Sequence, residues 1–164
     1  MTWPAVDLDP VARLRVLARV LPGVSLEERT IRAPFDAVWG FVSDLPNSVP
    51  RFDSDVSSIT ILEREGDRLK IISRPPYLPI PFRVDVELRE GWCWMTSRPQ
   101  AYVVGMAAVP QGHDTRFAML EGVAVPSPHA LRAVLAPIHA ISRWRHDRHL
   151  PHDVDGIERA LQLH

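Results

Sequence analysis

The most constraining feature of this sequence is a series of short segments within residues 54–125 in which apolar and polar side chains alternate. In the clearest segment, Phe82, Val84 and Val86 alternate with charged residues. Successive side chains of a strand point to opposite faces of a sheet, so a period of two predicts half-buried strands. Glycine-containing turns separate the segments and are typical of antiparallel hairpins. We therefore predict six antiparallel strands here and a seventh in residues 24–32.

Helical periodicity flanks the first strand. Apolar side chains in residues 10–21 recur at a spacing of three and four after an acidic N-cap, which predicts a helix. We expect this helix to pack on the outside of the domain and not to lie on an anionic membrane, because anchoring Trp and Phe side chains are absent. A second apolar stripe predicts a short helix over residues 35–42, and the prolines that follow allow a broken turn or another short helix.

The C-terminal part of the chain predicts one long helix. Ile138 and Ile141 fall on a single apolar stripe of this segment. Proline lacks the backbone N–H that an interior helical residue donates, so Pro137 predicts a kink and Pro151 predicts a break. The break would leave residues 154–163 as a final turn or two.

Composition and charge exclude several classes of protein. The 19 basic and 20 acidic side chains give a formal net charge of -1, which provides no field to attract nucleic acid. The single cysteine, Cys93, excludes an internal disulfide, and we interpret it as a small buried apolar residue. The start of the chain lacks signal-peptide order, and no apolar run reaches the ~18 residues that span a bilayer. We expect a cytoplasmic protein without nucleic-acid partners or membrane insertion.

A local motif in the first third of the chain adds to the pattern of elements. It consists of an apolar residue, Ala-Pro, Val-Trp and Asp, followed by Pro, an aromatic residue and a strand: Ile31, Ala33-Pro34, Val38-Trp39, Asp44, Pro50, Phe52 and residues 56–61. The motif and the element order resemble the START-like helix-grip superfamily (SRPBCC), in its polyketide cyclase/dehydrase and lipid transport branch. Phe52 stands where this family often has tryptophan, and the resemblance covers residues 24–163.

The resemblance implies an α+β helix-grip fold. In that fold a seven-stranded curved antiparallel sheet wraps around a long C-terminal helix, with two short helices after the first strand. Residues 1–23 would form an N-terminal helical extension, and residues 24–164 the START-like domain. The resemblance also implies an apolar cavity that holds a small lipid-like, polyketide-like or aromatic molecule, and it brings no catalytic signature and no cofactor.

Three functions remain open at this stage. The first is a carrier or sensor that binds a small hydrophobic molecule in the cavity. The second is a cyclase, aromatase or dehydratase that acts on such a molecule in the same cavity. The third is a protein-interaction module that uses the proline-rich loop 75–81 or the first helix. We expect this loop to form a rim at the cavity mouth, with simple rigidity of the loop as the alternative.

Glu121 is the candidate catalytic residue. It shares a strand face with Phe117 and Met119, which would place a carboxylate among apolar side chains. Burial raises the pKa of a carboxyl and suits it to acid or base chemistry near neutral pH. The other face of this strand is nearly as apolar. The alternative is therefore that a bulge turns Glu121 outward.

Further candidates are expected to line the cavity. Trp92 and Trp94 share a strand face and would form a flat wall for a planar ligand, and Tyr102 would offer a hydroxyl. Ordinary core packing is the alternative for the tryptophans. The other predicted ligand-binding residues are Phe82, Val84, Phe117, Met119, Glu121 and Ile138.

The histidines predict no metal site. His146, His149 and His152 are spaced by three, but Pro151 leaves the position of the third imidazole undefined. We interpret them as an exposed helix end whose basic residues suit the helix dipole. His139 lies beside the apolar stripe and is expected to be a core or edge histidine, with a contact to a ligand from the cavity floor as the alternative. No phosphate-binding glycine loop, nucleophile elbow or zinc-protease signature occurs.

Overall fold

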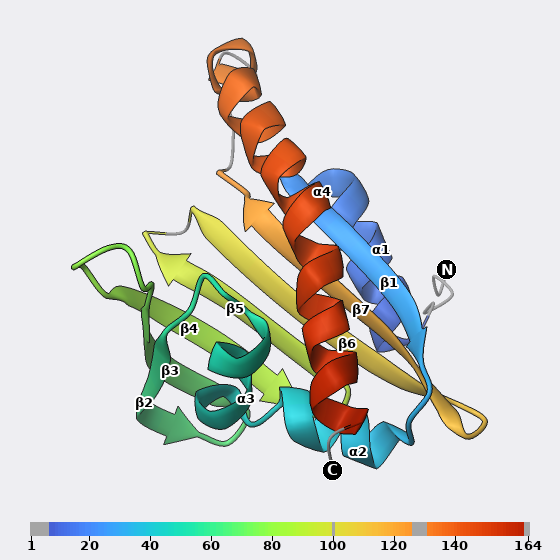
Figure 1. Ribbon diagram of the computed structural model, residues 1–164. Helices are drawn as coiled ribbons and strands as arrows, with labels where there is room; N and C mark the ends of the chain where they lie inside the picture. The colour runs from blue at the N-terminus through green and yellow to red at the C-terminus, as the bar shows by residue number, and fades with distance from the viewer. Residues whose placement is uncertain (1–6, 100, 126–130, 163–164) are drawn as a thin grey trace, which may run out of the picture.

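Seven strands form one antiparallel sheet in the computed structural model, which describes residues 7–99, 101–125 and 131–162 (Figure 1). The strands are β1 (Val24–Ile31), β2 (Ser58–Glu65), β3 (Arg68–Arg74), β4 (Phe82–Arg89), β5 (Trp92–Arg98), β6 (Tyr102–Gln111) and β7 (Asp114–Val123). Their order across the sheet is β1-β7-β6-β5-β4-β3-β2, so β1 pairs with the last strand of the chain and each other neighbour is a hairpin partner. The predicted seven-stranded antiparallel sheet is confirmed.

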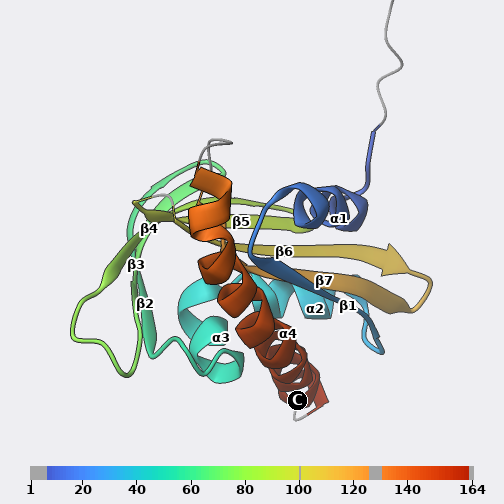
Figure 2. The same cartoon turned by 90° about the horizontal axis from the view of Figure 1, so that it is seen from above.

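Within the described residues, four helices accompany the sheet: α1 (Pro10–Val20), α2 (Phe35–Val42), α3 (Leu45–Phe52) and α4 (Arg132–Gln162). Figure 2 shows α1 on one face of the sheet and α2, α3 and α4 on the other. The sheet curves around the face that carries α4, which packs mainly against β1 and β7. This is the helix-grip arrangement that the sequence predicts.

The predicted break at Pro151 is wrong. α4 is one helix of 31 residues that continues through both Pro137 and Pro151. Leu150 and Val154, on either side of Pro151, are fully buried against the rest of the domain. Packing on both sides of the proline therefore holds the helix together, although the proline removes one backbone hydrogen bond.

The face of the sheet opposite α4 is also buried, because α1 covers it. Val11 and Leu14 of α1 are completely buried against Ala107 and Leu120, which point outward from β6 and β7. α1 approaches closely because Gly105 has no side chain: an added Cβ would lie 2.6 Å from a methyl group of Leu14. Both faces of the central strands are thus apolar for structural reasons.

α4 is fixed to β1 and β7 by polar contacts along its length. The Ser142 hydroxyl donates to the Gly23 carbonyl at 2.7 Å and accepts from the Val123 N–H at 2.9 Å. About two turns before the end of the helix, Asp155 forms an ion pair with Arg29 of β1. These contacts fix the rotation of α4 and thereby decide which of its side chains face the sheet.

The start of α4 projects past the end of the sheet (Figure 1). Val134, Ile138 and Ile141, in the first three turns of α4, are about half to two thirds exposed. The predicted apolar stripe is therefore not buried on the sheet as a whole. Ile138 and Ile141 lie at the opening of the space beneath the helix, and the buried apolar side chains of α4 come later, at Leu150, Val154 and Ile157.

Candidate ligand-binding cavity

A cavity of about 650 Å³ lies between α4 and the inner face of the sheet. Its size is within the range of small-molecule sites. Most of its wall is apolar, and the apolar side chains come from α3, from β2 to β7 and from the start of α4: Val49, Phe52, Val56, Ile59, Ile71, Phe82, Val84, Met95, Val104, Met106, Met119, Val123, Ile138 and Ile141. Polar groups gather at one part of the wall, where β6, β7 and α4 meet.

A larger hollow of about 910 Å³ lies between the end of α1 and the outer side of α4. Arg19, Arg143 and Asp147 line it together with His139. Charged side chains alternate in this wall with apolar ones such as Val20 and Trp144, whereas the wall of the smaller cavity is mostly apolar, so we place the ligand site in the smaller cavity. His139 lies outside that cavity, and the alternative role suggested for it, at the cavity floor, is wrong.

Several predicted ligand-binding residues line the cavity as expected. Phe82 and Val84 of β4 face it from one side, and Met119 and Ile138 face it from the other. Phe117 is fully buried in the core beside the cavity and does not line it. Its predicted contact with the ligand is therefore not supported by its position.

The predicted orientation of Trp92 and Trp94 is wrong. Both side chains lie on the outer face of the sheet, stacked with ring centroids 6.1 Å apart, and they pack beneath α1. The antiparallel register pairs Leu88 with Cys93 and Val86 with Met95, so Cys93 and Met95 are the inward residues of β5. Cys93 is fully buried, and burial raises the pKa of its thiol to about 12, which agrees with a small apolar residue.

Glu121 points inward and is hydrogen-bonded to Tyr102. Its side chain is 2% exposed, and it shares a hydrogen bond with the Tyr102 hydroxyl in the cavity wall. The Tyr102 oxygen also lies 2.8 Å from Nε2 of His146 on α4. Three elements therefore bring one carboxyl, one phenol and one imidazole into a connected row.

The contacts of His146 identify which ring nitrogen carries the proton. Nδ1 lies 2.6 Å from the Ser142 carbonyl oxygen, which can only accept, so Nδ1 carries a proton. In a neutral imidazole Nε2 is then the acceptor, and it faces the Tyr102 hydroxyl. The row has two proton arrangements: a neutral one in which Glu121 is protonated, and an ionic one in which Glu121 is charged and His146 is an imidazolium.

The environment favours the neutral arrangement. Burial, with the Asp53 carboxylate as a second cause, raises the pKa of Glu121 to about 7. Burial lowers the pKa of His146 below its ordinary value. Burial and the neighbouring Glu121 carboxylate raise the pKa of Tyr102 well above its ordinary value. The carboxyl therefore holds a proton more tightly than usual and the imidazole less tightly, which places the proton of the row on Glu121 and leaves His146 free to accept one.

A second polar group adjoins this row. Asp53 and Asp55, which follow α3, line the cavity, and Arg145 of α4 forms an ion pair with Asp55. His149 of α4 lies close to Asp53 and to Asp153, one turn further along. Neighbouring carboxylates, first that of Asp53, raise the pKa of His149 to about 9, and burial followed by Asp53 raises the pKa of Asp153 to about 8.

The interpretation of the three spaced histidines as an exposed helix end is wrong for two of them. His146 is buried in the cavity wall, and His149 is largely buried beside Asp53. Only His152 is exposed, where Nδ1 contacts the Arg148 carbonyl at 2.8 Å. The reason is the attachment of α4 to the sheet, which turns two of the three imidazoles inward.

Loop 75–81 lies at the mouth of the cavity. Pro75, Tyr77 and Leu78 line the opening, and Arg145 donates a hydrogen bond to the Tyr77 oxygen at 3.2 Å. Tyr77 and Leu78 are about half exposed. The position of the loop agrees with a rim, and the arginine connects that rim to α4.

Within the described parts of the chain, no helix combines the length and the apolar character needed to cross a bilayer.

Comparisons with known proteins agree with this fold. No protein-family model matches the chain. A segment of 78 residues, 48% of the chain, is 36% identical to a Streptomyces halstedii protein described as "Putative polyketide cyclase", and the match spans 63% of that relative's length.

Solved structures give broader coverage at low identity. The Zhui aromatase/cyclase from a Streptomyces species has a TM-score of 0.61 at 11% identity, over 85% of this chain and 93% of that one. A START superfamily protein from Mycobacterium smegmatis has a TM-score of 0.58 at 15% identity, over 85% and 97%. The resemblance stated from the sequence is confirmed: the chain has the START-like helix-grip fold, and its structural neighbours include a polyketide aromatase/cyclase.

Proposed function

We propose that this protein binds a small, largely apolar molecule that carries at least one oxygen, as a carrier or sensor. The observation that carries the proposal is the division of the cavity wall. Apolar side chains make up most of it, and the hydroxyl of Tyr102 lies with Glu121 and His146 at one part. Burial of apolar area would supply most of the affinity, at roughly 25 cal/mol per Å². The polar row would orient the oxygen.

The chemistry of the wall indicates the class of ligand. Polyketide-like and aromatic molecules, and lipids with a polar head, combine an apolar body with oxygens at one end. The names of the similar proteins, a polyketide cyclase, an aromatase/cyclase and a START superfamily protein, support the same class. A strongly anionic ligand is not favoured, because the carboxyl groups of Glu121, Asp53 and Asp55 lie in the wall.

Filling the cavity tests the proposal. Val84→Trp would place a large side chain in the cavity from β4. Leu62→Trp adds the same side chain at a half-exposed position of β2, outside the cavity. We expect 2-naphthol or tetradecan-1-ol to bind the wild-type protein and the Leu62→Trp variant with equal affinity, measured by calorimetry. Val84→Trp should bind at least about tenfold more weakly. Equal affinity in all three proteins would place binding outside this cavity and contradict the proposal.

A second candidate function is an acid–base enzyme of the cyclase or dehydratase type. The row Glu121–Tyr102–His146 favours it, because the row holds a protonated carboxyl and an unprotonated imidazole nitrogen in one wall. Elimination of water from a β-hydroxy ketone needs a base for the carbon-bound proton and an acid for the leaving hydroxyl. His146 would take the first proton and Glu121 would supply the second. Transfer through Tyr102 would then restore both groups, so the protons balance.

The enzyme candidate has its own test. An aryl β-hydroxy ketone gains a conjugated double bond on dehydration, which ultraviolet absorbance follows directly. We expect Glu121→Gln to lower kcat by about 100-fold or more, as loss of a general acid does, with substrate binding retained. Turnover by the wild-type protein no faster than in buffer would remove the enzyme candidate and leave the binding proposal standing.

A further inference from the structure

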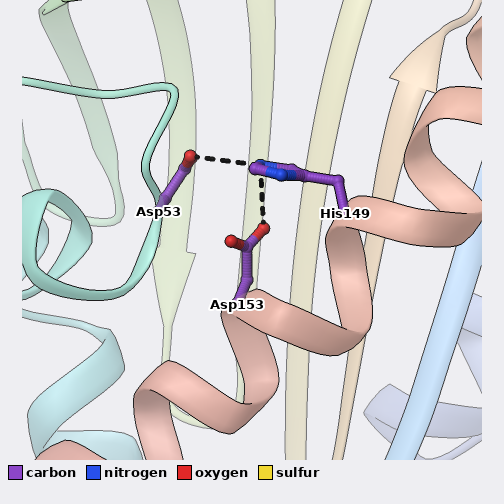
Figure 3. Close-up of side chains that lie close together, drawn as sticks. All are labelled: Asp53, His149 and Asp153. Carbon is purple, nitrogen blue, oxygen red and sulfur yellow. Dashed lines mark ion pairs between the residues drawn. The ribbon is translucent and has the colours of Figure 1, made fainter.

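Three potential metal ligands converge beside the cavity (Figure 3). Nε2 of His149 lies 3.5 Å from Oδ1 of Asp53 and 3.2 Å from Oδ2 of Asp153. All three ligand atoms lie within 4.8 Å of one another. A third carboxylate oxygen, Oδ2 of Asp55, lies 3.8 Å from the same imidazole nitrogen. One imidazole therefore faces three carboxylates.

The fold builds this convergence from two distant segments. His149 and Asp153 are four residues apart on α4, so they share one face of the helix. Asp53 directly follows α3, and α3 approaches α4 closely at Gly156. A Cβ at Gly156 would lie 3.1 Å from the Phe52 Cα and 3.2 Å from the Phe52 oxygen, so a larger residue would push Asp53 away from His149.

Hydrogen bonds within the chain leave the site incomplete. Asp153 is 1% exposed and Asp53 is 5% exposed. Among the described residues, Oδ2 of Asp153 and Nε2 of His149 are buried atoms without a hydrogen-bond partner. Their separation of 3.2 Å exceeds the ~2.7–2.9 Å of a charge-assisted N–H···O bond. Oδ1 of Asp53 accepts one hydrogen bond, from the Asp55 N–H at 2.8 Å. A buried carboxylate oxygen without a partner, such as Oδ2 of Asp153, is costly, and a cation beside it would remove this cost.

The distances of 3.5 Å and 3.2 Å from the imidazole nitrogen to the Asp53 and Asp153 oxygens suit atoms that bind one ion. Ligands about 2.1 Å from one ion at tetrahedral or octahedral angles lie roughly 3.0–3.4 Å apart. We propose that Asp53, His149 and Asp153 form a binding site for a divalent ion of the first transition row, such as Zn²⁺ or Mn²⁺. The sequence predicted no metal site, so this proposal departs from that prediction. It does not depend on the proposed function, because binding of a small molecule in the cavity requires no ion.

The donor set selects the class of ion. An imidazole nitrogen suits zinc and other transition ions better than magnesium or calcium, and carboxylates suit manganese and zinc alike. Asp53 and Asp55 also line the cavity, so the cavity side offers room for water or a ligand oxygen as a further donor. We therefore expect Zn²⁺ and Mn²⁺ to bind, and Mg²⁺ to bind at least about tenfold more weakly.

Metal binding to the chelator-treated protein tests the inference. Equilibrium dialysis followed by elemental analysis should give one Zn²⁺ or one Mn²⁺ per chain, and calorimetry should give the affinity. Asp153→Asn and His149→Ala should each weaken binding by at least about tenfold, because each removes a direct ligand. His152→Ala and Asp147→Asn change an exposed imidazole and an exposed carboxylate on the same helix, and they should leave binding unchanged.

A measurement on the wild-type protein covers the case in which a variant does not fold. Mn²⁺ is paramagnetic and broadens the NMR signals of nearby protons. The ring signals of His149 should therefore disappear at substoichiometric Mn²⁺, while those of exposed His113 and His152 remain. Absence of any binding tighter than millimolar, equal affinity in His149→Ala, or uniform broadening of all histidines would each overturn the inference.

Discussion

Tyr102 of β6 and His146 of α4 are 44 residues apart in the chain, yet the phenol oxygen lies 2.8 Å from Nε2 of the imidazole. This contact joins the long helix to the centre of the sheet through the cavity wall. Because Tyr102 also hydrogen-bonds Glu121, the pair connects a helix residue to a buried carboxyl that it does not contact directly. Several measurable consequences depend on this connection and on the packing around it.

The first prediction concerns Glu121 and pH. The pKa of Glu121 is about 7 in the folded protein against an ordinary value of 4.5, so the folded state holds the proton more tightly than the unfolded state. Its contribution to stability is complete below pH 4.5 and is lost as the pH rises through about 7. We expect the free energy of unfolding of the wild type to fall relative to Glu121→Gln by about 2–3 kcal/mol across this window.

Urea denaturation at a series of pH values measures this difference. The charged and titratable groups around Glu121 are the same in both proteins. The difference in the free energy of unfolding therefore reports on the Glu121 carboxyl alone. These surrounding groups are Asp53, Asp55, Tyr102, His146 and His149. Glu90→Gln, at an exposed position, serves as the control and should show no such trend. If the difference in the free energy of unfolding between the wild type and Glu121→Gln were constant with pH, Glu121 would not be buried as described.

The second prediction concerns the Tyr102 hydroxyl. Tyr102→Phe removes the group that hydrogen-bonds Glu121 and His146 and leaves both buried partners unsatisfied. We expect a loss of about 1–3 kcal/mol in the free energy of unfolding. Tyr77→Phe removes a hydroxyl from a half-exposed tyrosine of the rim and should cost less than about 1 kcal/mol. Equal effects of the two substitutions would contradict the described role of Tyr102.

The third prediction concerns the packing of α1 on the outer face of the sheet. Leu14 is completely buried, and Leu14→Ala should destabilise the protein by about 3 kcal/mol in thermal or urea unfolding. Val16→Ala, on the exposed side of the same helix, should change stability by less than about 0.5 kcal/mol. If both variants were as stable as the wild type, residues 1–23 would be a dispensable extension instead of a part of the packed domain.

The fourth prediction concerns two glycines in helices. Gly156→Ala should destabilise the protein by about 1–3 kcal/mol, because the new Cβ meets the Phe52 backbone. Gly40→Ala in α2 has nothing within 4 Å of the new Cβ and should stabilise it by about 0.5–1 kcal/mol, since Ala favours helices. Stabilisation by both substitutions would contradict the close approach of α3 to α4, and with it the placement of Asp53.

The fold is predictable from the sequence because its patterns are local. Alternation along the strands, glycines in the turns and the apolar stripe of the last helix are each decided by a few neighbouring residues. Pro151 is the exception. Its effect on the helix depends on the burial of Leu150 and Val154, which only the complete fold determines.

The face that each strand turns inward is harder to predict when both faces are apolar. α1 covers the outer face, so the large apolar surfaces of Trp92 and Trp94 are buried without lining the cavity. The hairpin itself carries a usable signal. With Glu90-Gly91 as the turn, Leu88 must face Cys93 and Val86 must face Met95, which puts the tryptophans on the opposite side from Val84 and Val86.

The polar part of the site is only partly predictable. Glu121 and Tyr102 stand out as polar residues on strands with an apolar face. His146 lies four residues after Ser142 on the predicted stripe, and that spacing was a signal for an inward imidazole. Asp53 and Asp55 follow a short helix among other polar residues, and only the approach of α3 to α4 places them at the cavity.

Native mass spectrometry of the purified protein tests the central proposal, that the cavity binds a small apolar molecule with an oxygen at Tyr102, most directly. We predict that a fraction of the protein molecules carries the added mass of one bound small molecule. Extraction of this molecule should identify it as an apolar compound that carries oxygen. Val84→Trp should lose this mass and Leu62→Trp should keep it. Absence of any bound molecule, together with no thermal stabilisation by a panel of lipids and aromatic compounds, would contradict the account.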